Sequence, residues 1–191
     1  MRGPPSMKKV LIAILLIVSM WSMTIQADAL SDQQYAGDQL KTLGILKGYE
    51  DGTLGLEKNI TRAEIATMMV RIQGYDGLII AKNGFEFKDI LKDHWAYLNV
   101  QNAYKLGVVS GYPDGTFKPG KQISYAEMVA MMVKTLTNNQ PVEGTWPSNY
   151  IDKGKSLGVI PTTSTIDPGK IINRGEAAKI LWDTLVSKKA Y

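Results

Sequence analysis

Apolar residues recur three and four positions apart in three stretches of the chain, a spacing that predicts amphipathic helices with one buried stripe. The three stripes comprise Ile65, Met68, Met69 and Ile72; Met128, Met131 and Met132; and Ala177, Ile180 and Leu181. A turn-rich loop precedes each stripe, and a Leu-Gly pair typical of a helix end precedes each loop. The pattern therefore predicts helix, loop, helix three times over.

Each of these three helices begins with a capping-box pattern. A good N-cap residue is followed three positions later by glutamate, whose side chain can return to the N-cap backbone N–H. The pairs are Thr61 and Glu64, Ser124 and Glu127, and Asn173 and Glu176. We therefore interpret the glutamates as structural caps and not as catalytic acids.

The three segments are copies of one repeat. Residues 43–64 and 106–127 align without a gap and share Leu-Gly, Gly-Tyr, Asp-Gly-Thr and Ala-Glu. Residues 157–176 form a third copy, two residues shorter, without the Gly-Tyr loop. Trp95 and Trp146 each stand twelve residues before the glycine of a Leu-Gly pair. A helix pair of this size cannot bury its apolar face alone, so the copies must pack together.

The first segment has the features of an export signal. Lys8 and Lys9 precede an apolar run, and Ala27-Asp28-Ala29 provides the small-x-small pattern of a cleavage site. We expect residues 1–29 to be a signal peptide, with an uncleaved membrane anchor as the alternative and either Met1 or Met7 as the start. The repeats then occupy residues 30–80, 85–138 and 139–191.

Composition excludes several classes of function. Loss of residues 1–29 lowers the net charge from +4 to +2, and no concentrated basic face suggests a nucleic-acid partner. The chain has no cysteine, and its single histidine, His94, has no second ligand nearby for a metal site. The loops at Asp51 and Asp114 have too few oxygen ligands for calcium. We expect neither metal nor cofactor.

The copies resemble S-layer homology domains, whose signature is F-x-D, a tryptophan, a Gly-Tyr-x-Asp-Gly-Thr-F-x-P loop and an I-T-R-A-E helix start. The matching residues are Phe87, Asp89, Trp95, Gly111 to Phe117 and Pro119 in the second copy, and Ile60 to Glu64 in the first. The resemblance spans residues 31–187. It implies a mainly α fold of three helix-loop-helix repeats, packed as a pseudo-threefold spindle with grooves between neighbouring repeats.

The resemblance also implies a function. Such domains attach secreted proteins to the bacterial cell wall by binding anionic, often pyruvylated, secondary cell-wall polysaccharide. Arg62 and Arg174 occupy the first helical position, where a cation opposes the helix dipole. This placement favours an anion bound by the guanidinium and by free backbone N–H groups. The alternative is a solvated arginine or one paired with an acid.

Three further residues are candidates for glycan contact. Trp95 and Trp146 have the area either to stack on a sugar ring or to fill a core. Asp89 could accept hydrogen bonds from sugar hydroxyls or cap the segment before Trp95. Because the second copy has Tyr125 in place of the arginine and the third lacks its loop, we expect at most two competent grooves.

Two other functions stay open on sequence alone. The first is an envelope assembly protein that acts through self-association or a protein partner. The second is a cell-wall hydrolase, which would need a catalytic domain, whereas the repeats take up the chain after residue 29. We therefore expect no enzymatic activity.

Overall fold

The computed structural model describes residues 31–80 and 86–188, and it confirms the mainly α fold. Residues 31–42 are helical, and five further helices follow: α2 (Arg62–Ile72), α3 (Tyr97–Lys105), α4 (Tyr125–Leu136), α5 (Ser148–Ser156) and α6 (Arg174–Lys188). The predicted signal peptide, residues 1–29, lies outside the described residues. Within the described ranges no helix has the length and apolarity needed to cross a membrane.

The first helix of each repeat ends at the predicted glycine. Gly44, Gly107 and Gly158 have φ angles of 71°, 72° and 70°, a left-handed conformation that other residues adopt only at a cost. The N–H of the next residue then donates across the helix end, from Ile45 to Leu40, Val108 to Ala103 and Val159 to Gly154, each over 2.9 Å. These bonds make a Schellman motif, which turns the chain into the loop.

The second helices, α2, α4 and α6, form the centre of the molecule. All three capping boxes are present, with both reciprocal hydrogen bonds between the N-cap residue and the glutamate. Most of the predicted stripe is fully buried, for example Ile65, Met69, Met132 and Leu181, whereas Ile72 and Ile180 are partly exposed. The helical periodicity therefore identified the core-facing side of each helix.

The chain segments before these helices meet in a closed ring. The N–H of Ile60 donates to the carbonyl of Ile172, Ile172 donates to Ile123, and Ile123 donates to Ile60, over 3.1–3.3 Å. All three side chains are buried. The ring gives the three repeats the pseudo-threefold arrangement that the family resemblance implied.

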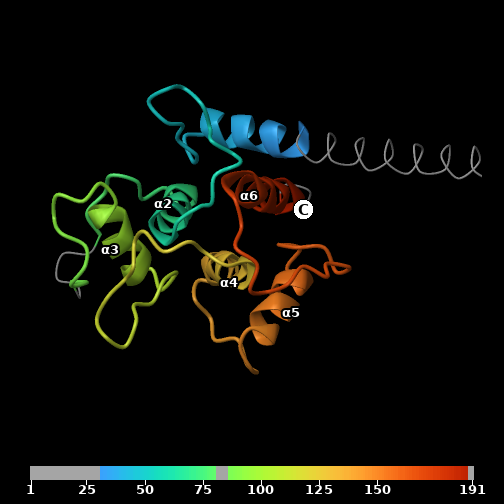
Figure 1. The fold of residues 1–191 in the computed structure, drawn as a ribbon. Coiled ribbons are helices and arrows are strands. Elements are labelled where there is room, and N and C mark those ends of the chain that lie inside the picture. Colours follow the sequence, from blue (N-terminus) through green and yellow to red (C-terminus); the bar gives the residue numbers. More distant parts are fainter. Residues whose placement is uncertain (1–30, 81–85, 189–191) are drawn as a thin grey trace, which may run out of the picture.

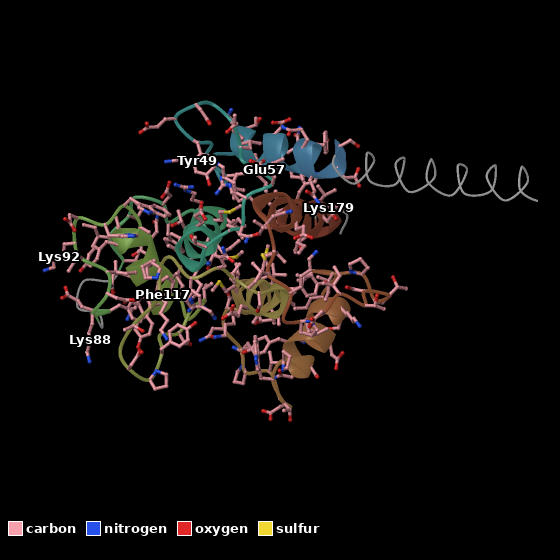
Figure 2. The ribbon with its side chains drawn as sticks, viewed as in Figure 1. Tyr49, Glu57, Lys88, Lys92, Phe117 and Lys179 are labelled. Carbon is pink, nitrogen blue, oxygen red and sulfur yellow. The ribbon has the colours of Figure 1, made fainter. Side chains whose placement is uncertain are left out.

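The first helix of each repeat packs outside this centre, against the second helix of a neighbouring repeat (Figure 1). Helix α3 of the second repeat packs on α2 of the first, and α5 of the third packs on α4 of the second. The helix of residues 31–42 lies beside α6, with Tyr35 edge-on to Trp182 at 6.0 Å and Asp32 paired to Lys179 at 3.5 Å. The first helix of each repeat therefore packs on a neighbouring repeat. Figure 2 shows Lys179 where α6 meets the helix of residues 31–42.

Candidate functional site

Three cavities lie at equivalent positions around the ring, and we call them grooves A, B and C. Groove A contains Arg174, Glu64 and Trp95; groove B contains Arg62, Glu127 and Trp146; groove C contains Tyr125, Glu176 and Gln33. Their volumes are about 270, 250 and 720 Å³ respectively. In each groove the three residues come from three different repeats, so no single repeat forms a complete groove.

Groove B is built around the guanidinium of Arg62. Its Nε donates to the carbonyl of Phe117 at 3.1 Å, Nη2 donates to the carbonyl of Ser110 at 3.3 Å, and Nη1 pairs with Glu127 at 3.5 Å. The guanidinium carbon lies 5.1 Å from the ring centre of Tyr112. Arg62 is 6% exposed, so the loop of the second repeat holds it in one position.

Groove A repeats this arrangement. Nε of Arg174 donates to the carbonyl of Leu54 at 2.9 Å, Nη2 to that of Lys47 at 2.9 Å, and Nη1 pairs with Glu64 at 2.6 Å. The ring centre of Tyr49 lies 5.0 Å from its guanidinium carbon, and Figure 2 labels Tyr49 in the loop before α2. The same motif residues therefore build the same site twice.

The arginines have capacity for a ligand, but the helix starts do not. A guanidinium carries five N–H donors, and the hydrogen bonds above use three in each groove, which leaves two. The backbone N–H groups of Arg62 and Ala63 donate to Lys121 and Pro119, at 2.9 and 3.2 Å. The expectation of free backbone N–H groups at these helix starts is therefore wrong, because the loop of the neighbouring repeat already occupies them.

Trp95 and Trp146 line the grooves from the outside. They are 62% and 51% exposed, which excludes the alternative of core residues. Trp95 stacks on His94 with ring centres 5.6 Å apart, and Trp146 meets Tyr150 edge-on at 5.8 Å. Each indole therefore has a supporting ring and an open face, which is the geometry required of a sugar platform.

Asp89 has a different place from the one predicted. Its two carboxylate oxygens accept the backbone N–H groups of Phe117 and Lys118 at 2.8 and 2.7 Å, and it lines none of the three grooves. It neither reaches a groove nor caps the segment before Trp95. Instead it fixes the loop that carries the Arg62-binding carbonyl of Phe117.

A lysine beside each groove was missed by the sequence analysis. Lys58, Lys121 and Lys170 stand at the same position of all three copies, three residues before the N-cap, and this identity was the available signal. Lys121 donates to Glu127 at 2.9 Å and to the hydroxyl of Tyr112 at 3.1 Å. These bonds raise the pKa of Lys121. Lys170 pairs with Glu176 in the same way.

The carboxylate of Glu127 supports a pH prediction. Burial raises its pKa, but the hydrogen bonds from Ser124 and Lys121 and the charge of Arg62 outweigh it, so the pKa lies below the ordinary 4.5. Such a group stabilises the fold above its unfolded-state pKa and loses this effect as the pH falls through the lowered value. Glu127→Gln should cost about 1–3 kcal/mol at pH 7 and clearly less at pH 3, measured by urea unfolding. An equal cost at both pH values would contradict this linkage.

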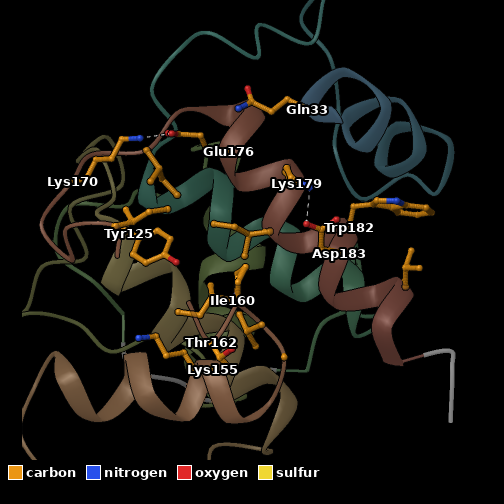
Figure 3. A pocket seen from close by; sticks show the side chains of 17 residues that line it. Gln33, Tyr125, Lys155, Ile160, Thr162, Lys170, Glu176, Lys179, Trp182 and Asp183 are labelled. Carbon is orange, nitrogen blue, oxygen red and sulfur yellow. Dashed lines mark hydrogen bonds and ion pairs between the residues drawn. The ribbon is translucent and has the colours of Figure 1, made fainter. Parts of the chain in front are cut away.

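Groove C departs from the other two at the arginine and tryptophan positions. Tyr125 replaces the arginine and shares a hydrogen bond with Ser164 at 3.0 Å. Asp32 stands where grooves A and B have tryptophan, twelve residues before the Leu-Gly glycine, and pairs with Lys179. Figure 3 shows the wide cavity that results, with Tyr125, Ile160 and Trp182 around it. Two arginine grooves and one without arginine therefore surround the ring.

In residues 31–80 and 86–188, no group of three or more histidine, cysteine or acidic side chains is arranged to hold a metal ion. Asp51 and Asp114 instead accept the N–H and hydroxyl of Thr53 and Thr116, at 2.6–3.0 Å. These hydrogen bonds lower the pKa of both carboxyls and close the Asp-Gly turns.

Sequence comparison connects this geometry to a known family. The model of the S-layer homology domain matches residues 38–66 and 86–129, the segments that contain the loops of grooves A and B. The third repeat lies outside both matched segments. The match thus coincides with the two repeats whose Gly-Tyr loops are intact.

Three relatives of the chain are much longer proteins. The Middle cell wall protein of Brevibacillus brevis is 34% identical over 158 residues, which is 81% of this chain and 15% of that protein. The Surface layer protein of Brevibacillus choshinensis is 38% identical over 124 residues, 63% of this chain and 11% of that protein. The Cellulosome-anchoring protein of Acetivibrio thermocellus is 33% identical over 152 residues, 71% of this chain and 34% of that protein. The chain spans about a third or less of each relative.

Motif, geometry and comparison now agree. The I-T-R-A-E helix start contributes Glu64 to groove A and Arg62 to groove B. A Gly-Tyr loop lines each of these grooves, and the family model matches both loops. The relatives align with this chain across most of the repeat region. The chain therefore belongs to the S-layer homology domain family.

Proposed function

We propose that the chain binds an anionic secondary cell-wall polysaccharide, such as a pyruvylated one, in grooves A and B, and that it does so without catalysis. Family membership makes it a secreted, cell-wall-associated anchoring module. The observation that carries the proposal is the repeated pair of a fixed guanidinium with two spare N–H donors and an exposed tryptophan. The Cellulosome-anchoring protein among the relatives supports an anchoring role.

The two parts of each groove suit two parts of a charged sugar. A carboxylate accepts parallel hydrogen bonds from a guanidinium fork, and these charge-assisted bonds are about twice as strong as neutral ones. The open indole face offers a flat apolar surface for a sugar ring. Groove C lacks the arginine and has no tryptophan at the position of Trp95 and Trp146, and we assign it no part in binding the anion.

The proposal is tested by co-sedimentation of residues 30–191 with purified cell walls, before and after the secondary polymer is stripped chemically. Because the arginines also hold the fold, their removal confuses binding with stability, so the exposed tryptophans are the better probes. We expect Trp95→Ala/Trp146→Ala to weaken binding by on the order of thirtyfold, since central aromatic anchors contribute about 2 kcal/mol.

The matched control is Leu91→Ala, which truncates a 69% exposed apolar side chain outside the grooves. Its pelleting should equal that of the wild type, and all variants should unfold at the same urea concentration. If the wild type stays in the supernatant even with intact walls, polysaccharide binding is wrong. A protein partner in the envelope then becomes the better hypothesis.

A further inference from the structure

One position in each second helix distinguishes the three grooves. It lies seven residues, or about two helical turns, after the capping glutamate and therefore on the same helix face. Groove A has Arg71 at this position, groove B has Lys134 and groove C has Asp183, and all three side chains line their groove. The three copies thus place an arginine, a lysine and an aspartate at one equivalent point.

In grooves A and C the charge at this position is already paired. Nε of Arg71 donates to Asp76 at 3.1 Å, and Nη1 donates to the carbonyl of Ile45 at 3.1 Å. Asp183 accepts a hydrogen bond from the ammonium of Lys179 at 2.9 Å, a contact drawn in Figure 3. Both side chains therefore connect parts of the fold.

Lys134 in groove B has no such partner. Among the described residues no hydrogen bond or ion pair reaches its ammonium, although the side chain is half-buried. Burial and the positive charge of Arg62 lower its pKa below the ordinary value. The nearby acid, Glu127, is already shared by Arg62 and Lys121. A half-buried ammonium with three unused donors is costly unless an anion joins it.

We propose that Lys134 is a second anion-binding residue of groove B, contacting the same carboxylate or phosphate group of the ligand as Arg62. The inference rests on the proposed function and adds a difference between the two arginine grooves. In groove A the equivalent Arg71 already forms an ion pair with Asp76, so an anion there would have to compete with that carboxylate.

Affinity is measured by calorimetry with polymer fragments released from purified walls. Trp95→Ala serves as the background, because it weakens groove A and leaves groove B as the stronger binding site. In that background Lys134→Met should lower the affinity about tenfold, as expected for the loss of one charge-assisted hydrogen bond. Lys134→Arg should restore most of the affinity. Lys105→Met removes an exposed lysine outside the grooves and should change nothing.

Stability separates this role from a structural one. Lys134→Met removes an unpaired cation that Arg62 repels, so the free energy of unfolding should stay equal or rise. A drop in stability together with unchanged affinity would overturn the inference and leave the proposed function intact. Fragments with pyruvyl groups removed by mild acid, or phosphate groups removed by hydrofluoric acid, distinguish a carboxylate from a phosphate ligand.

A second probe does not depend on the polymer. Pyruvate or inorganic phosphate is titrated into the wild type while the side-chain resonances of Lys134 are followed by NMR. An anion in contact with Lys134 should raise its pKa. If fragments bind but neither anion perturbs Lys134, the inference is wrong and the proposed function stands. If an anion perturbs Lys134 but no fragment binds, the polysaccharide is wrong; if neither binds, both proposals fail.

Discussion

Arg174→Ala is expected to destabilise the protein by about 3–5 kcal/mol, because it removes the buried arginine of an ion pair and leaves the partly buried Glu64 without its counter-charge. Arg174 is 4% exposed, and its guanidinium joins Glu64 of the first repeat to the loop carbonyls of Leu54 and Lys47. Its loss therefore weakens the contact that closes the third repeat onto the first. Urea unfolding of the variant and the wild type measures the difference.

Groove B provides the matched comparison. Arg62→Ala should cost less than Arg174→Ala, because the contact between Arg62 and Glu127 is 3.5 Å against 2.6 Å, and Glu127 keeps Lys121 as a second partner. The double variant Arg174→Ala/Glu64→Gln should recover part of the loss, since it leaves no unpaired carboxylate. Equal costs for the two arginines would show that the ion pair contributes little and that packing of the side-chain stem dominates.

Phe117→Ala should cost about 3–5 kcal/mol, the usual penalty for emptying a fully buried phenylalanine site. The ring of Phe117 is 0% exposed, packs on Phe87 with ring centres 5.4 Å apart, and lies 4.9 Å from the guanidinium carbon of Arg62. Its removal leaves a cavity directly beneath the arginine of groove B. Thermal and urea unfolding measure the loss of stability.

The control for this cavity is present in the chain itself. Leu54 stands at the equivalent position of the first repeat, with its carbonyl bound to Arg174 in the same way. Phe117→Leu therefore introduces the residue that groove A uses and should cost less than half as much as Phe117→Ala. A similar loss of stability for both substitutions would mean that the aromatic ring of Phe117 is needed to pack against Phe87, and that a side chain of similar volume is not enough.

Local signals predicted the helices well. The capping boxes, the Leu-Gly helix ends and the apolar stripes depend on residues within a few positions of one another, so each could be read from the chain directly. Thr61 with Glu64 and the left-handed Gly107 are found as expected. The family motif supplied the threefold arrangement, which local spacing alone could not.

Contacts between repeats were harder to predict. The loop carbonyl of Lys121 that occupies the N–H of Arg62 lies in another repeat, and no local pattern indicates it. Within the second repeat, Asp89 reaches across 28 residues to fix Phe117, which no local pattern indicates either. Whether Arg71 pairs with Asp76, and whether Lys134 lacks a partner, depends on the three-dimensional positions of their charged groups. Aligning the three copies column by column would nevertheless have marked Lys58, Lys121 and Lys170.

The helix of residues 31–42 closes the molecule by lying beside α6, so the first and last described helices are neighbours. The three repeats therefore contact one another in a closed cycle. The covalent chain connects the first repeat to the second and the second to the third, but not the third to the first. In topological terms the order of the repeats depends only on where this cycle is cut. A circularly permuted chain that enters at the second repeat and passes through the third into the first would preserve all three grooves.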